Sequence, residues 1–176
     1  MDTNILQEKS IENLKAAEKC VEENCYYAAL SRLYYSIFQK IKYCIMTGKD
    51  NYYSYYKQHL GVRIVYTSKG ETNTIPRGEF EHCKIAADLT KFLNITYSID
   101  KTELSEHIRT INDMRVLREK ADYSPDDITD IQNVPIQDLK NFVSKRIRKT
   151  KDLITYIDSI INEEEEKENE DENFSC

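Results

Sequence analysis

The chain has 176 residues, of which 40% are hydrophobic and 32% are charged. This length and composition suit one compact domain with its own hydrophobic core. Four glycines and three prolines are too few for a loop-rich or all-β protein, so the composition predicts a mostly α-helical domain.

The formal net charge of −6 is spread unevenly along the chain. Residues 163–176 contain eight acidic residues and one lysine, and the rest of the chain contains 24 basic and 23 acidic residues. A run of like charges with few apolar residues is typical of disorder. We therefore expect a nearly neutral helical domain over residues 1–162 and a disordered acidic tail over residues 163–176.

The cysteines show no paired CxxC spacing, and their number is odd: Cys20, Cys25, Cys44, Cys83 and Cys176. The sequence also shows no signal peptide and no apolar run of about 18 residues. These features predict a reduced, cytoplasmic protein with no membrane segment, no metal site and no cofactor. We expect Cys20, Cys44 and Cys83 to be small core residues within helices.

Apolar residues at three- and four-residue spacing predict a first helix over Asn4–Asn24 and a second over Cys25–Thr47. Gly48 follows at a position typical of a helix C-cap. Ten of the thirteen tyrosines lie between Tyr26 and Tyr66. Tyrosine suits half-wet surfaces such as interfaces and clefts, but the same rings could simply pack around a small core without tryptophan.

Residues 49–76 interrupt the helical pattern and read as an exposed insertion that contacts a partner. A short helix is expected over Asn51–Leu60. Gly61–Pro76 alternates β-branched and polar residues around a Lys-Gly turn, which predicts a β-hairpin.

Three further helices are predicted over Arg77–Asn94, Lys101–Tyr123 and from Pro135 to about Asn162. Asp100 and Glu103 have the spacing of a capping box. Together the predicted elements form an all-α, antiparallel bundle of about five helices with a small insertion between the second and third.

The end of the fourth predicted helix carries charges at the edge of its packed face. One stripe along this helix comprises Leu104, Ile108, Ile111, Arg115, Arg118 and Asp122. Charges in this position are costly unless they pair or face a cleft. Arg118 and Asp122 lie four residues apart and can pair. The corner that Arg118 and Asp122 form at this helix end is therefore either an ordinary ion pair or part of a binding site.

Two stretches, AALSRLYYSIFQ (Ala28–Gln39) and LREKADY (Leu117–Tyr123), followed by a long last helix, resemble the HEPN superfamily. The subgroup that they resemble comprises small prokaryotic proteins with an Arg-x-x-x-Asp-Tyr corner. The resemblance covers residues 10–160, with residues 49–76 as an insertion. It implies a helical bundle that forms a homodimer, with the arginine corner at a cleft between the protomers.

Many HEPN proteins are metal-independent ribonucleases, and others act in toxin–antitoxin, anti-phage or CRISPR-linked systems, some with a nucleotidyltransferase-type partner. By position, Arg118 corresponds to the motif arginine, and Asp122 and Tyr123 occupy the region of the family's histidine and tyrosine. No histidine follows Arg118 in this chain. Histidine is the usual proton acceptor for such cleavage, so the corner favours binding of RNA or a nucleotide over cleavage.

His82 is a further candidate, because the family often has a histidine near this point, and it would complete a composite site with Arg118. The alternative is a partly exposed helical histidine without a functional role. Arg77 and His82 also match the family spacing of an arginine, four residues and a histidine. They would open the third helix, which is the wrong place in the fold.

Candidate nucleic-acid-binding residues are Arg32, Arg115, Lys145, Arg146, Arg148 and Lys149. The last four crowd one segment of the final helix, which could follow a phosphate backbone or be the solvated face of an amphipathic helix. We expect a HEPN-type defence or toxin–antitoxin protein that binds RNA. The alternatives are a non-catalytic interaction subunit and a regulatory helical module whose acidic tail binds a basic partner.

Overall fold

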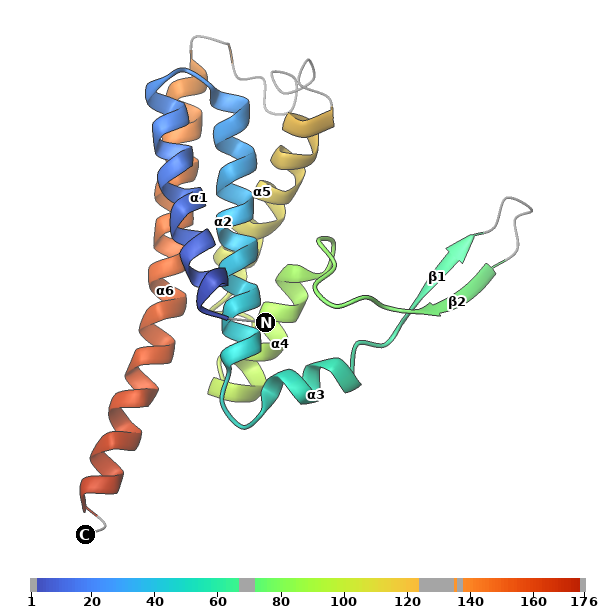
Figure 1. Cartoon of the computed structure of the whole chain (residues 1–176), viewed down its shortest axis with the longest axis vertical. Helices are drawn as coiled ribbons and strands as arrows, with labels where there is room; N and C mark the ends of the chain where they lie inside the picture. The colour runs from blue at the N-terminus through green and yellow to red at the C-terminus, as the bar shows by residue number, and fades with distance from the viewer. Residues whose placement is uncertain (1–2, 67–71, 124–134, 136–137, 175–176) are drawn as a thin grey trace.

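The chain folds into a bundle of helices with a small β-hairpin at its side (Figure 1). The computed structural model describes residues 3–66, 72–123, 135 and 138–174. The elements are α1 (Asn4–Glu22), α2 (Tyr26–Thr47), α3 (Tyr52–Gln58), β1 (Val62–Tyr66), β2 (Thr72–Pro76), α4 (Ile85–Tyr97), α5 (Ser105–Tyr123) and α6 (Leu139–Phe174). The predicted all-α bundle with an insertion after its second helix is confirmed.

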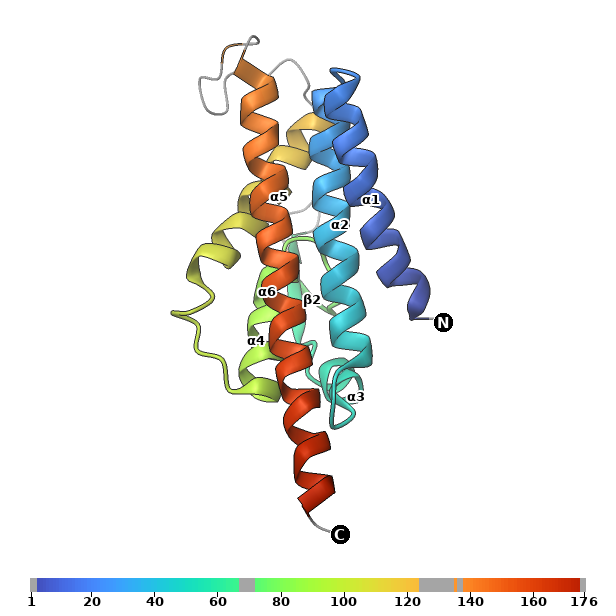
Figure 2. The same cartoon turned by 90° about the vertical axis from the view of Figure 1, so that its left-hand side faces the viewer.

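The four long helices α1, α2, α5 and α6 alternate in direction along the bundle (Figures 1 and 2). Helix α2 contacts all of the other helices. It is therefore buried on more than one face, and its core residues include Leu30, Leu33, Tyr34, Ile37, Ile41 and Ile45. In the buried contact between α1 and α2, the Ser10 and Ser36 hydroxyls each donate to the other residue's carbonyl, at 2.9 and 2.8 Å. Both buried hydroxyls are thus satisfied.

A buried charge joins α2 to α6. The side chain of Lys40 is only 3% exposed, and its ammonium group pairs with Asp158, which is 45% exposed. The ammonium also lies 5.3 Å from the centroid of the Tyr43 ring. An ammonium buried to this degree requires such a partner, so the pair fixes how α6 lies against α2.

The insertion forms the short helix and the hairpin that the sequence predicts. β1 and β2 pair antiparallel, with Val62 opposite Pro76 and Tyr66 opposite Thr72. The predicted Lys-Gly turn between the strands lies outside the described residues. The hairpin projects away from the bundle (Figure 1).

Gly48 ends α2 for a different reason from the one predicted. Its φ of −58° and ψ of 150° are open to any residue, so it is not a left-handed cap. A Cβ atom at this position would lie 2.5 Å from Cε2 of Phe92. The absence of a side chain therefore lets the ring of Phe92 pack against the end of α2.

The helix starts predicted after the hairpin are wrong by several residues. α4 begins at Ile85 instead of Arg77, because Phe80 has a φ of +54° and interrupts any helix through this segment. α5 begins at Ser105, and Asp100 accepts a hydrogen bond from the Thr102 N–H at 2.5 Å instead of forming a capping box. α6 begins at Leu139 instead of Pro135, and the Asp138 N–H just before it donates to the Pro135 carbonyl at 2.8 Å.

For residues 163–174, the part of the predicted disordered tail that the structure describes, α6 instead continues as a helix to Phe174. The segment from 163 to 174 contains no glycine or proline and is rich in glutamate, a good helix former. Helix propensity and continuity with α6 therefore prevail here over the repulsion between like charges.

The cysteines differ in burial. Cys44 is buried and Cys20 is half-buried, as expected for core residues, but Cys83 is exposed because it precedes α4 instead of lying within it. No helix in the described part of the chain is both long and apolar enough to cross a bilayer.

Candidate functional site

Arg118, in the second-to-last turn of α5, is held by contacts from two helices. Its Nε lies 2.7 Å from Oδ2 of Asp122, and its Nη2 donates to the Tyr35 hydroxyl on α2 at 2.5 Å. The side chain of Arg118 is only 13% exposed. Burial by itself lowers the pKa of Arg118, but the hydrogen bond to Tyr35 and the charge of Asp122 raise it above its usual value. The guanidinium is therefore a fixed positive charge.

Two aromatic rings flank this charge. The Cζ atom of Arg118 lies 5.2 Å from the ring centroid of Tyr35 and 5.5 Å from that of Tyr123, both within the range of a cation–π contact. Tyr123 is 73% exposed. The structure thus brings three of the predicted residues, Arg118, Asp122 and Tyr123, into one corner and adds Tyr35 from α2.

A hollow of about 510 Å³ opens beside this corner. Its lining residues come from α2 and the end of α5: Tyr27, Ala28, Ser31, Arg32, Tyr35, Ala121 and Asp122. The Ser31 hydroxyl donates to Asp122 and joins the two helices. Arg32 is exposed and donates to Oδ1 of Asn13 at 3.3 Å. A ligand in this hollow would meet Arg32 and the ring of Tyr35.

His82 lies close to the same corner, although it is not in a helix. Its Nδ1 is 2.8 Å from the Tyr34 hydroxyl, and its ring stacks on Phe38 with centroids 4.3 Å apart. Its centroid is 6.2 Å from that of Tyr35, whose hydroxyl binds Arg118. Burial and then the positive charge of Arg118 lower the pKa of His82, so the imidazole is neutral at pH 7. The fold therefore places His82 where it interacts electrostatically with Arg118.

Arg77, the other arginine that matched the spacing to a histidine, is committed elsewhere. Its Nη2 lies 3.3 Å from Asp88, and its Nε lies 3.5 Å from Glu81. The Arg77 side chain is 14% exposed. These two ion pairs stabilise the turn before α4, which gives Arg77 a structural role.

The remaining predicted basic residues make several different contacts. Arg115 pairs with Glu119 on α5 at 2.6 Å. On α6, Lys149 binds Glu106 at 2.8 Å, and the guanidinium of Arg146 lies over the ring of Phe142. The two others, Lys145 and Arg148, line a shallow hollow of about 290 Å³ together with Asn141 and Ser144.

Within the described part of the chain, no group of three or more histidine, cysteine, aspartate or glutamate side chains is arranged to hold a metal ion. No family model, curated protein or solved structure matches the chain.

The sequence did not single out Ser31, Tyr34 or Phe38 as site residues. They lie within the AALSRLYYSIFQ stretch, and Ser31 is one turn before Tyr35, which is the signal that could have found them. In chemical terms the corner offers a fixed guanidinium, an exposed aromatic ring and a neutral imidazole. This set suits the binding of a phosphate that is attached to a planar base.

Proposed function

We propose that this chain is a HEPN-type protein that binds single-stranded RNA at the Arg118 corner. The observation that carries the proposal is the placement of a charged, preorganised Arg118 between the rings of Tyr35 and Tyr123. A guanidinium binds phosphate oxygens through two parallel hydrogen bonds. The exposed ring of Tyr123 offers a stacking surface for the attached base.

In a second part of this proposal, His82 takes the place of the histidine that is missing after Arg118. When Nδ1 donates to the Tyr34 hydroxyl, Nε2 presents a lone pair that can accept a proton. Cleavage would form a bond between the 2′-oxygen and the adjacent phosphorus and break the bond to the 5′-oxygen. The 2′-proton would pass to His82, which then returns a proton to the leaving oxygen. Arg118 would stabilise the negative charge that develops on the phosphate.

The resemblance supports the biological part of the proposal. We infer a homodimer with the corner facing the cleft between the protomers, in a prokaryotic toxin–antitoxin or anti-phage system. A nucleotidyltransferase-type protein is one partner that the resemblance suggests.

The alternative function, a non-catalytic subunit that holds a protein partner, is favoured by the hairpin. Val62 and Ile64 on β1 are each 63% exposed. A two-stranded hairpin is marginally stable in water by itself, so these side chains are suited to contact with another protein. The partner would be a component of the same defence or CRISPR-linked complex.

RNA binding by wild type and Arg118→Ala under metal-chelating conditions tests the proposal. Arg109→Ala is the matched control, because Arg109 is an exposed arginine on the same helix that pairs with nearby Glu106. A hydrogen bond to a charged group contributes about 1.5–3 kcal/mol. Its loss predicts a roughly ten- to hundredfold weaker affinity for Arg118→Ala, and we expect no change for Arg109→Ala. Equal affinities for all three proteins would refute RNA binding at this corner.

Cleavage is tested on the same RNA with His82→Gln. If His82 is the proton acceptor, this variant keeps its RNA affinity but loses cleavage. If wild-type protein binds RNA without cleaving it, the enzymatic part of the proposal is wrong and the binding part stands. If wild-type protein binds no RNA, the interaction subunit is the better description.

A further inference from the structure

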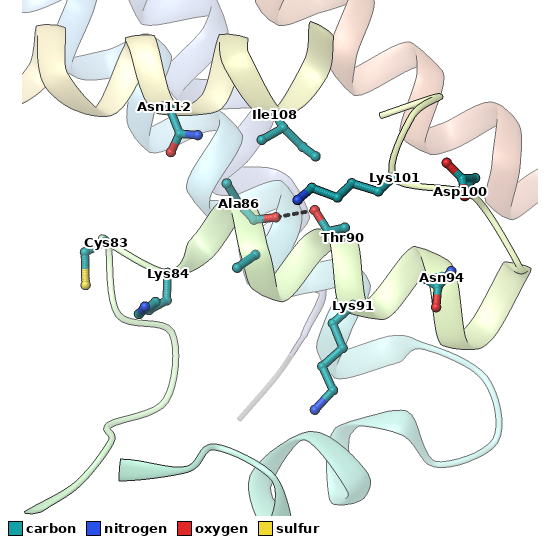
Figure 3. A pocket seen from close by; sticks show the side chains of 11 residues that line it. Cys83, Lys84, Ala86, Thr90, Lys91, Asn94, Asp100, Lys101, Ile108 and Asn112 are labelled. Atoms are coloured by element: carbon teal, nitrogen blue, oxygen red, sulfur yellow. Dashed lines mark hydrogen bonds between the residues drawn. The ribbon is translucent and has the colours of Figure 1, made fainter. Parts of the chain in front are cut away.

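A second pocket, separate from the Arg118 corner, lies between α4 and the first half of α5 (Figure 3). Its volume is about 570 Å³, within the range of about 300–1,000 Å³ of small-molecule sites. Three lysines line it, Lys84, Lys91 and Lys101, against one acidic residue, Asp100. The pocket lining therefore carries an excess of two positive charges.

Two of these lysines are available to a ligand. The side-chain ammonium groups of Lys84 and Lys101 form no hydrogen bond or ion pair with any residue that the structure describes, whereas the ammonium of Lys91 lies 5.0 Å from the ring centroid of Tyr55. Figure 3 shows the side chain of Lys101 reaching across the pocket toward Thr90, and Asn112 pointing into it from α5. Ammonium and amide donors that face the same hollow are suited to bind an anion.

The acidic residue offsets only one of the three positive charges and is bound by a neighbouring residue. Asp100 accepts hydrogen bonds from Thr102, which lower the pKa of its carboxyl group. Thr90 donates its hydroxyl hydrogen to the Ala86 carbonyl at 2.8 Å, so that hydrogen is not available to a ligand. Lys101, Lys84 and Asn112 are thus the donors that an incoming anion would meet.

The pocket adjoins the Arg118 corner along two segments of the chain. Cys83 and Lys84 of its lining directly follow His82. On α5, Asn112 lies three residues before Arg115 and six before Arg118. Six residues rise about 9 Å along a helix, so one strand of a few nucleotides is long enough to reach both sites.

We propose that the α4–α5 pocket is a second phosphate subsite for the same RNA strand, bound by Lys84 and Lys101 with Asn112. This inference rests on the proposed function and adds the length of the ligand. A mononucleotide fills one subsite, whereas an oligonucleotide spans both. The bound RNA runs from the end of α5 past His82 to the start of α4.

The test measures, by fluorescence anisotropy, the affinity for single-stranded RNAs from one to about eight nucleotides, of which the longer ones reach the site sizes typical of single-strand binding proteins. The proteins are wild type, Lys84→Ala/Lys101→Ala and the control Lys9→Ala/Lys15→Ala. The control removes the same charge from exposed positions on α1, which lies across α2 from α4 and α5 (Figures 1 and 2). Asn112→Asp places a negative charge in the pocket and is a second, independent variant.

We expect wild-type affinity to rise with RNA length until both subsites are filled. Lys84→Ala/Lys101→Ala binds the longest RNA about tenfold more weakly and the mononucleotide equally well. Its plot of log affinity against log salt concentration is shallower by about 0.7 for each phosphate that the variant no longer neutralises. Asn112→Asp acts in the same direction. If both variants bind long RNA like wild type while Arg118→Ala does not, the second subsite is wrong and the proposed function stands. If wild type binds no RNA of any length, the proposed function fails as well.

Discussion

Replacing Asp122 with asparagine is expected to lower the stability of the fold while strengthening the binding of phosphate at Arg118. The Asp122 carboxylate lies 2.7 Å from Nε of Arg118 and accepts a hydrogen bond from Ser31. Asparagine keeps the shape and one acceptor oxygen but removes the charge. The substitution therefore separates the role of the carboxylate in holding Arg118 from its competition with a bound phosphate.

The size of each effect follows from the burial of the pair. The side chains of Arg118 and Asp122 are 13% and 28% exposed, between an exposed pair and a buried one. Exposed pairs contribute at most about 1 kcal/mol and breaking buried pairs costs about 3–5 kcal/mol, so we expect a loss of about 1–2 kcal/mol in the free energy of unfolding. A carboxylate and a phosphate about 6 Å apart repel each other by about 3 kcal/mol at an effective dielectric constant of about 20. Screening reduces this to about 1 kcal/mol, or roughly fivefold tighter RNA binding.

Urea unfolding and RNA titration of wild type, Asp122→Asn and the control Asp113→Asn measure both effects. Asp113 is a half-buried aspartate on the same helix, so its substitution removes the same charge away from Arg118. If Asp122→Asn binds RNA more weakly than wild type, Asp122 serves mainly to position Arg118 and the competition argument is wrong.

Three further predictions concern stability. Gly48→Ala is expected to lower the free energy of unfolding by about 1–3 kcal/mol, because the new Cβ would lie 2.5 Å from Phe92; an unchanged urea midpoint would contradict this packing. Asp158→Asn leaves the buried ammonium of Lys40 without its carboxylate and is expected to destabilise by about 3 kcal/mol, whereas Lys40→Met removes the buried charge and stays within about 1 kcal/mol of wild type in the same titration. Because burial and the nearby guanidinium lower the pKa of His82 below 6.5, the unfolded chain takes up this proton first, and stability is expected to fall as the pH decreases below 6.5. His82→Gln should flatten this dependence in unfolding experiments between about pH 5.5 and 7.5, and an unaltered slope would show that other groups cause it.

The long helices could be predicted because their apolar residues repeat at helical spacing. Leu30, Leu33, Ile37 and Ile41 of α2 are all buried, as the pattern required. The starts of α4 and α5 could not be predicted in the same way. They depend on the positive φ of Phe80 and on the contact of Asp100 with a backbone N–H, and neither changes the apolar periodicity.

The contacts of the candidate site are likewise only partly predictable from the sequence. The pairing of Arg118 with Asp122 follows from their spacing of four residues and needs no knowledge of the fold. The hydrogen bond from Ser31 to Asp122 joins residues 91 positions apart, and the one between Tyr34 and His82 joins residues 48 positions apart. Such contacts depend on how the helices pack, which a single sequence does not reveal.

The lack of a histidine after Arg118 in the sequence therefore weighs less against catalysis in the folded chain than the linear motif suggests. Tyr34 and Tyr35 are consecutive residues of α2, and the hydroxyl of the first binds His82 while that of the second binds Arg118. Because both tyrosines belong to the central helix of the bundle, a shift of α2 moves both contacts together. His82 and Arg118 are thus held relative to each other by one rigid element, although they lie 36 positions apart in the chain. A proton acceptor supplied by the fold can take the role that the linear motif assigns to a neighbouring histidine.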